Sequence, residues 1–312
     1  MTSLRIVFMG SPDFAVPSLQ ALHQRHQVVA VVTQPDRPQG RGQMLAPTAV
    51  KAAAQKLGLE VLQPDNLRRQ SVRDQLAALG ADLFVVVAYG KILSAKMLAI
   101  PPGGCVNVHA SLLPKYRGAA PIHWAIIKGE KRTGVTIMRL DEGMDTGPIL
   151  LQEPISIAAG ETGGSLHDRL AILGADALLK ALDGLSDGTL KPTPQPETGA
   201  SLAPLLSKDD GWANFRRSGE EVDCWIRGLD PWPGAFTTLG ADRLKLFGSC
   251  LATGQGGNAG EVLATDNRGL LVACGQDAVW IRELQLAGRR RMPAKALLAG
   301  RPIPAGTVLG TS

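Results

Sequence analysis

Two side chains that can act on a bound ligand lie two positions apart in NVHASLLPKYRGAAPIHWAI, residues 107–126. Asn107 offers a carboxamide that donates hydrogen bonds, and His109 offers an imidazole that titrates near neutral pH. In an extended strand, residues i and i+2 point to the same side, so the two groups share one face. Pro114 then restricts the residue before it, Leu113, to extended geometry. We therefore predict one half of a site with acid–base capability at this strand end.

A second segment supplies a carboxylate. TGVTIMRLDEGMDTGPIL, residues 133–150, is typical of a strand that runs into a loop, and the loop holds Asp145. Gly143 and Gly147 flank it and allow its backbone to approach a ligand closely. An aspartate there can reach the imidazole of His109. Spacing alone leaves a second interpretation open, in which the histidine is a hydrogen-bonded structural residue and the aspartate forms a turn.

Short apolar runs rich in valine and isoleucine alternate with helical patterns in the first half of the chain, and these elements must position the polar groups. Helices are predicted near Val16, with Pro17 in the first turn, and over about 48–57 and 68–79. This alternation predicts an α/β fold with a doubly wound parallel sheet, which binds ligands beyond the carboxyl ends of its strands. The predicted buried strands are 4–9, 28–33, 82–88 and 104–109.

The turn after the first strand, GSPDF, contains only Gly10. A dinucleotide-binding turn needs three glycines, for the tight turn, the approach of the pyrophosphate and the packing of the helix. The sequence therefore argues against a nicotinamide-dependent oxidoreductase.

A proline-rich stretch, KPTPQPETGA at 191–200, is predicted to be extended and to form neither a ladder nor a helix interior. We place the domain boundary there, with a first domain at 1–190, a linker at 191–207 and a second domain at 208–312. One amphipathic helix and several short strands with glycine turns predict a small β-barrel in the second domain. The helix stripe comprises Val222, Trp225, Ile226 and Leu229, and the strands lie near 235–239, 243–249, 260–264, 269–274 and 278–286.

The composition is ordinary for a soluble protein, with 45% hydrophobic and 20% charged residues and no apolar run near the roughly 18 residues that span a bilayer. The amino-terminal LRIVFMG enters a strand without a basic region or cleavage site, so we predict a cytoplasmic protein without a membrane partner. The cysteines form no C-x-x-C pair, so neither a metal site nor a disulfide framework is expected, and we predict buried thiols. They are Cys105, Cys224, Cys250 and Cys274.

Basic residues exceed acidic ones by 33 to 28, which gives a formal net charge of +5, with a pI near 9.1. This balance permits a polyanionic partner. The basic residues concentrate in 282–301, where Glu283 is the single acid, although such a run is more often a solvated face on composition alone. The run comprises Arg282, Arg289, Arg290, Arg291, Lys295 and Arg301.

NVHASLLPKYRGAAPIHWAI followed by GVTIMRLDEGMDTGPIL resembles the signature of the formyltetrahydrofolate-dependent formyltransferases, whose catalytic Asn, His and Asp match Asn107, His109 and Asp145. Other stretches resemble the branch of that family whose members formylate initiator methionyl-tRNA. This resemblance covers both domains and implies a Rossmann-like catalytic domain, a C-terminal OB-like tRNA-binding barrel and 10-formyltetrahydrofolate as donor. The further stretches are GSPDFAVPSL (10–19), TQPDRPQGRG (33–42), QPDNLR (63–68), VVVAYGKIL (85–93) and PWPGAF (231–236).

The resemblance also assigns binding residues. It matches the loop DRPQGRGQML (36–45) to one that enters the acceptor-stem region, although composition alone favours a mobile surface loop. In that loop Arg41 aligns with a functional arginine and Arg37 is a second candidate for a phosphate contact. The stretch 289–303 fits the family's C-terminal pattern, which favours an RNA-facing role for Arg289, Arg290 and Arg291. Folate contacts are assigned to Ser111, Leu112, Leu113 and Pro114, and a pterin wall to Ala88, Tyr89 and Gly90.

The implied chemistry suits these residue types. A neutral amine that attacks a formyl carbon generates an oxyanion and an ammonium group. Asn107 can donate to the oxyanion, and His109 can donate to the same oxygen or pass a proton to the leaving nitrogen. Asp145 orients the ring and stabilises its charged form. No metal is required, and nothing in the sequence indicates an obligate protein partner.

Two other functions remain open at this stage. A related transferase that formylates a small amine, such as an amino-sugar nucleotide, would share the Asn/His/Asp set without needing Arg41 or a basic barrel. A folate- or RNA-binding protein without turnover is the other, and the intact set argues against it. One departure from the family lies at 209–215, where DDGWANF replaces an Ile-Asp-Trp-like stretch.

Overall fold

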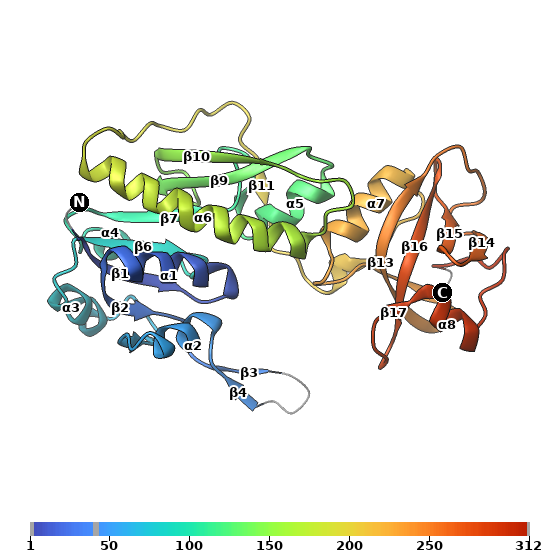
Figure 1. Cartoon of the computed structure of the whole chain (residues 1–312), viewed down its shortest axis with the longest axis horizontal. Coiled ribbons are helices and arrows are strands. Elements are labelled where there is room, and N and C mark those ends of the chain that lie inside the picture. Colours follow the sequence, from blue (N-terminus) through green and yellow to red (C-terminus); the bar gives the residue numbers. More distant parts are fainter. Residues whose placement is uncertain (1–2, 40–43, 311–312) are drawn as a thin grey trace. The chain divides into compact units, whose positions relative to one another are not determined.

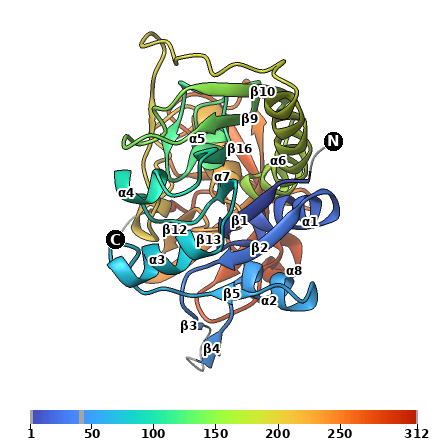
Figure 2. The ribbon, with the colours of Figure 1, turned by 90° about the vertical axis from the view of Figure 1, so that its left-hand side faces the viewer.

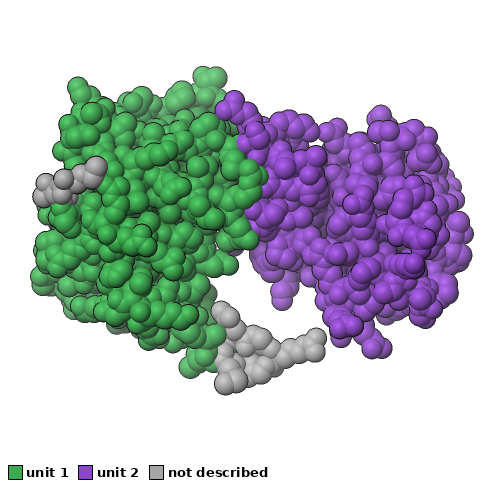
Figure 3. All heavy atoms as spheres, in the orientation of Figure 1, with its two compact units in different colours: residues 1–121, 133–155, 167–203 green, residues 122–132, 156–166, 204–312 purple. Residues whose placement is uncertain are grey.

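The computed structural model describes residues 3–39 and 44–310. Its chain forms two compact units, coloured separately in Figure 3. The predicted domains were contiguous in sequence, whereas 122–132 and 156–166 group with the second unit. Within that unit the indole nitrogen of Trp124 donates to the carbonyl oxygen of Pro204 over 2.9 Å. Unit 1 comprises residues 1–121, 133–155 and 167–203, and unit 2 comprises 122–132, 156–166 and 204–312.

Unit 1 is built on a seven-stranded sheet with the order β10-β9-β7-β6-β1-β2-β5, which can be followed in Figures 1 and 2. The strands from β7 to β5 are parallel, and β9 runs antiparallel to β7. The predicted doubly wound sheet and its four strands are confirmed, whereas β5 and β10 were not predicted. The strands are β1 (Arg5–Gly10), β2 (Gln27–Val32), β5 (Val61–Leu62), β6 (Leu83–Val87), β7 (Cys105–His109), β9 (Arg132–Arg139) and β10 (Ile149–Ser156).

The three predicted helices of the first domain are confirmed. A proline in the first turn starts α1, and the Thr48 side chain caps α2 by accepting from the amide of Lys51. No helix in the described part of the chain is both long and apolar enough to cross a membrane. The helices within residues 1–190 are α1 (Val16–Arg25), α2 (Ala49–Lys56), α3 (Gln70–Ala78), α4 (Ala95–Leu98), α5 (Pro121–Ile127) and α6 (Gly163–Ser186), with a short 3₁₀ turn, η1 (Asp13–Ala15).

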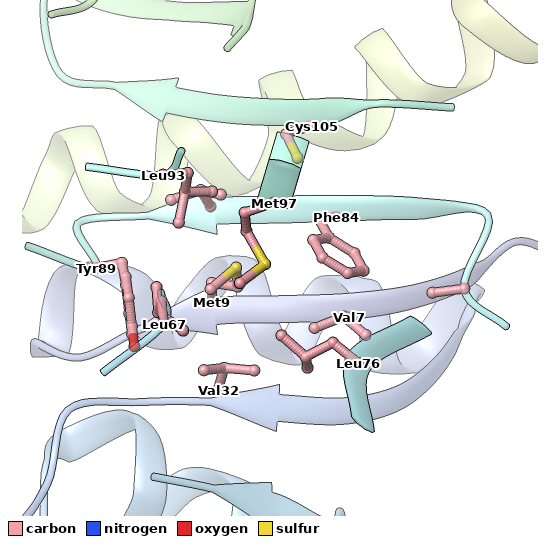
Figure 4. Packing of buried hydrophobic residues seen from close by; sticks show 12 residues of the cluster. Val7, Met9, Val32, Leu67, Leu76, Phe84, Tyr89, Leu93, Met97 and Cys105 are labelled. Carbon is pink, nitrogen blue, oxygen red and sulfur yellow. The ribbon is translucent and has the colours of Figure 1, made fainter. Parts of the chain in front are cut away.

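The two faces of the sheet pack against different helices. Figure 4 shows one face, where Met97 of α4 and Leu76 of α3 pack over the sheet residues Met9 and Phe84. Cys105 of β7 belongs to this cluster. The alternation along β7 therefore places Asn107 and His109 on the same face as Cys105, and Val106 and Val108 on the face toward α6.

The segment predicted to be a linker takes part in pairing within unit 1. Thr193 forms an isolated antiparallel bridge with Ile149, although residues 191–200 form no strand or helix. A proline on either side of a residue does not prevent that residue from using its own amide. Further along, β11 (Leu202–Ala203) pairs in parallel with β8 (Arg117–Gly118). A separate hairpin joins β3 (Arg37–Gln39) to β4 (Met44–Ala46).

Unit 2 contains the predicted small β domain, whose main pairings are antiparallel. Helix α7 (Gly219–Gly228) starts at a capping box formed by Ser218 and Glu221. The atypical stretch 209–215 joins this domain through a bridge between Trp212 and Phe236. The other elements are η2 (Asp209–Gly211), β12 (Phe236–Leu239), β13 (Asp242–Ala252), β14 (Val262–Asp266), β15 (Gly269–Ala273), β16 (Ala278–Leu286), β17 (Met292–Pro293) and α8 (Ala294–Gly300).

Candidate active site

His109 lies at the carboxyl end of β7 with both ring nitrogens close to oxygen atoms. Its Nε2 is 2.9 Å from the carbonyl oxygen of Tyr116, and its Nδ1 is 3.6 Å from Oδ2 of Asp145. Burial lowers the pKa of His109, while the Asp145 carboxylate and the Tyr116 carbonyl act in the opposite direction. The ring is thus neutral at rest, yet it has two oxygen neighbours that would stabilise its protonated form.

Asp145 is held by its backbone as well as by its carboxylate. The amide of Gly118 donates to Oδ2 over 2.8 Å, and the residue has a φ of +54°. Such a conformation is uncommon for a residue other than glycine. At Gly147 a Cβ would lie 2.0 Å from the carbonyl oxygen of Arg139, so only glycine fits this turn. The loop therefore directs the carboxylate toward His109, which is one of the two interpretations that the spacing left open.

Asn107 is 8% exposed and shares a strand face with His109. Among the described residues, none forms a hydrogen bond with its amide. Neither its amide nitrogen nor its amide oxygen is among the fully buried polar atoms that lack a partner, so the remaining exposure of the residue reaches this group. Its two N–H donors are therefore available to a ligand oxygen at the end of β7.

The loop after β7 is fixed by hydrogen bonds to its backbone. Thr136 of β9 accepts from the amide of Leu113 (3.1 Å) and donates to the carbonyl of Ser111 (2.7 Å). Gln152 of β10 donates to the carbonyl of Leu113 over 2.9 Å, and the Ser111 hydroxyl donates to the carbonyl of Lys115 over 2.6 Å. These contacts make the predicted folate-contacting segment a rigid edge beside the candidate catalytic residues.

The other predicted folate segment directly follows β6, which pairs with β7 through Val86 and Asn107. Ala88 has a φ of +48°, and the Tyr89 carbonyl accepts from the side-chain amide of Gln34 over 3.0 Å. Burial raises the pKa of Tyr89 to about 12, and its ring belongs to the core cluster in Figure 4. Of the seven predicted residues, Ala88 and Gly90 are exposed, Leu112 and Pro114 are half-buried, and Tyr89, Ser111 and Leu113 are buried.

The predicted RNA-binding arginines occupy different environments. Arg37 is exposed on β3, and Arg41 lies outside the described residues. Arg289 and Arg290 are exposed in the turn between β16 and β17. Arg291 differs from them because its guanidinium is paired with carboxylates.

The Arg291 guanidinium forms two hydrogen bonds with the carboxylate of Asp230, at 2.7 and 3.0 Å, and a third with Glu283. It also lies over the ring of Phe247, 4.2 Å from the centroid. A phosphate would have to compete with two carboxylates for this side chain. We therefore separate Arg291, a residue with clear structural contacts, from Arg289 and Arg290.

The sequence did not indicate three groups that complete the site: the Tyr116 carbonyl, the Gly118 amide and the side chain of Gln195. The first two are backbone atoms, which leave no signature in a sequence.

In the described part of the chain, no group of three or more His, Cys, Asp or Glu side chains could hold a metal ion. The cysteines are free thiols, buried except for Cys250, which is half-buried.

Comparison with known proteins gives matches across both units. Residues 4–182 match the formyl transferase family, and residues 205–302 match the formyl transferase C-terminal domain. The chain is 50% identical over 310 residues to the methionyl-tRNA formyltransferase of Trichlorobacter lovleyi, covering 99% of this chain and 98% of that protein. It is 47% identical over 311 residues to the methionyl-tRNA formyltransferase of Geobacter metallireducens, covering 99% and 100%.

Solved structures share the fold at lower identity. WlaRD, a sugar 3N-formyl transferase, matches with a TM-score of 0.69 and 19% identity over 93% of this chain and 100% of its own. HypX from Aquifex aeolicus, in complex with tetrahydrofolic acid, matches with a TM-score of 0.66 and 19% identity over 95% of this chain. The chain spans 47% of the length of HypX. At these identities the likeness is one of fold.

Proposed function

Because the chain belongs to the formyl transferase family, we propose that it transfers the formyl group of 10-formyltetrahydrofolate to the free amino group of initiator methionyl-tRNA. The observation that carries this proposal is identity of about half over the whole length to methionyl-tRNA formyltransferases. The pairing of His109 with Asp145 beside the unpartnered amide of Asn107 supports it. The reaction would take place in the cytoplasm, where translation begins.

The groups at the end of β7 suit a formyl donor. Its carbonyl oxygen accepts hydrogen bonds, and Asn107, a buried residue, offers an amide that has no partner among the described residues. The rigid edge at 111–114 and the exposed Ala88 and Gly90 flank this position and are our candidates for contacts with the folate. When bound, 10-formyltetrahydrofolate supplies an activated formyl group to the attacking amine.

The side chains would act on charge and protons. The amide of Asn107 donates to the formyl oxygen as negative charge develops there. His109 is neutral at rest, so its ring can take up a proton from the ammonium group formed by attack and pass it to the leaving nitrogen. Asp145 faces Nδ1 and stabilises the transient imidazolium. No step assigned to these side chains uses a metal.

The acceptor would be held by basic residues. We assign phosphate contacts to Arg37, Arg41, Arg289 and Arg290, with Arg291 mainly supporting the turn through Asp230. Contacts of this kind position an RNA and supply affinity without reading its sequence. The charge of +5 agrees with such a partner.

A single-turnover assay tests the proposal. The full chain is mixed with formyl-labelled 10-formyltetrahydrofolate and initiator methionyl-tRNA, and label on the methionyl group is followed in time. Matched reactions contain uncharged initiator tRNA or an amino-sugar nucleotide. We expect label only with methionyl-tRNA. Label on the amino sugar alone would favour the small-amine transferase, and binding of folate and tRNA without label would indicate a protein without turnover.

A further inference from the structure

Residues 191–203, the last stretch of unit 1 in the sequence, form the connecting segment, which lies along the candidate site. Besides the bridge between Thr193 and Ile149, the Ser201 hydroxyl accepts from the amide of Tyr116 over 2.9 Å. The next two residues form β11 against β8. The strand β8 and its preceding residue supply both backbone groups of the site: the Tyr116 carbonyl beside His109 and the Gly118 amide on Asp145. This connecting segment is therefore part of the site's framework.

One side chain of the segment points inward. In KPTPQPETGA all residues are exposed except Gln195, which is half-buried. Its Nε2 donates to the carbonyl oxygens of Asp145 and Gly147, both over 2.8 Å. Prolines stand on either side of it, and a residue that precedes a proline is restricted to extended geometry. The backbone therefore limits where this side chain can reach.

Arg117 fixes the orientation of the Gln195 amide. The guanidinium donates to Oε1 from Nε over 3.1 Å and from Nη2 over 2.7 Å. An arginine has donors only, so the amide oxygen must face Arg117. The two N–H bonds of Nε2 must then face the two carbonyls, one each. The hydrogen-bond network thus sets the direction of the amide without ambiguity.

These contacts hold a stretch of backbone that has an unfavourable conformation. Asp145 adopts a φ of +54°, and a non-glycine residue keeps such a conformation only when its surroundings impose it. Gln195 holds the carbonyl of Asp145 and that of Gly147, two residues further on. The carboxylate of Asp145 then reaches both the Gly118 amide and His109.

We propose that Gln195, oriented by Arg117, is a positioning residue that holds Asp145 against His109. The inference rests on the proposed function insofar as Asp145 acts in the reaction. Gln195 itself lies behind the loop and has no assigned contact with either substrate. Its loss is therefore expected to change the rate of the chemical step more than the binding of substrates.

Three variants of the full chain separate hydrogen bonding from packing. Gln195→Met keeps the length of the side chain and removes its donors. Gln195→Glu keeps the acceptor for Arg117 and directs a carboxylate at two carbonyl oxygens. Glu197→Gln is the control, because Glu197 is exposed in the same segment. We expect kcat to fall about 10–10²-fold for both Gln195 variants, more for the glutamate, with KM for each substrate within about 2-fold and the control unchanged.

A double-mutant cycle distinguishes positioning from general damage to the fold. If Gln195 acts through Asp145, then Gln195→Met should lower kcat by less than about 2-fold in the Asp145→Asn background, because the carboxylate that it positions is already absent. A loss of the same size in both backgrounds would overturn the proposal. So would a Gln195→Met variant with unchanged kcat.

Hydrogen exchange gives a readout that does not depend on activity. The Gly118 amide donates to the Asp145 carboxylate, so release of Asp145 should speed exchange of this amide about 10-fold in Gln195→Met. Exchange in β6 should not change. Unaltered exchange of the Gly118 amide would overturn the positioning role, whether or not the wild-type protein formylates methionyl-tRNA. Absence of formylation by the wild type would overturn the proposed function alone.

Discussion

The imidazole of His109 and the carboxylate of Asp145 face each other over 3.6 Å inside the protein, where the histidine is only 5% exposed. This relationship balances two opposing effects on one proton. Burial favours the neutral ring and lowers its pKa, and the carboxylate favours the charged ring. Burial has the larger effect, which has a consequence for stability as well as for catalysis.

Stability should therefore fall in acid because of His109. The ordinary pKa of 6.5 applies to the unfolded chain, and the folded protein has a lower value. The contribution of the neutral ring to the free energy of unfolding is complete above about pH 6.5, and it is lost as the pH falls from there toward the pKa of the folded protein. Between pH 7.5 and 5.5, we expect the free energy of unfolding in urea to drop more for the wild type than for His109→Gln. An equal drop in both proteins would contradict the burial effect.

Removal of the Asn107 amide should slow the reaction without weakening tRNA binding. Asn107→Ala removes a donor to the developing oxyanion, and loss of such a donor typically lowers kcat by about 10²–10³. Steady-state kinetics and tRNA binding measured on the same samples check this. Asn107→Asp, nearly the same size but without the donors, should be at least as slow. Near-normal turnover by Asn107→Ala would remove the residue from the mechanism.

The strand alternation was enough to place Asn107 and His109 on one face, because a two-residue period is a property of any extended chain. It could not show that the Tyr116 carbonyl would face the ring, since that contact depends on how the following loop folds back. The role of Gln195 could not be predicted from the sequence for another reason. A proline-rich segment has no periodicity, and the partner that orients this glutamine, Arg117, is 78 residues away.

Helix α6 likewise depends on tertiary packing that its local sequence does not indicate. Its 24 residues include several glycines, which weaken the helical propensity that a sequence can display. At Gly174 the structure gives a reason, because a Cβ there would lie 2.9 Å from a methyl group of Val108. The glycine allows the helix to approach β7 closely on the face opposite to His109. That requirement comes from packing and is invisible in the local pattern.

Replacement of Arg291 should destabilise the second unit. The Asp230 side chain is 6% exposed and takes two hydrogen bonds from Arg291, so Arg291→Met leaves a buried carboxylate without these partners. We expect a loss of about 1–3 kcal/mol in unfolding free energy. Chemical denaturation checks it, with Arg290→Met, at an exposed position, as the matched control. An equal stability of both variants would show that the ion pair does not support the fold.

Arg289 and Arg290 should affect RNA binding and leave stability unchanged. If each contacts a phosphate, its replacement by alanine should flatten the slope of log affinity against log salt by about 0.7–0.9, since fewer counterions are released on binding. Binding of initiator methionyl-tRNA across a salt series measures this slope. Arg268→Ala provides a control on the same unit, because Arg268 pairs with Asp266. Slopes that stay parallel to that of the wild type would remove both residues from the RNA interface.

Arg41 should influence the rate with methionyl-tRNA and not the binding of folate. It lies outside the described residues, so the prediction rests on its place in TQPDRPQGRG, where the flanking Asp36 is fixed by Lys51 (2.6 Å) and Gln63 (2.7 Å). An arginine that positions the acceptor end contributes to orientation, so Arg41→Ala should lower kcat/KM for methionyl-tRNA by about 10-fold or more. The donor should still bind with wild-type affinity in equilibrium titration. Arg37→Ala, at the described base of the same hairpin, shows whether the effect belongs to Arg41 or to any basic residue there. A variant with unchanged kcat/KM would mean that this loop does not place the acceptor.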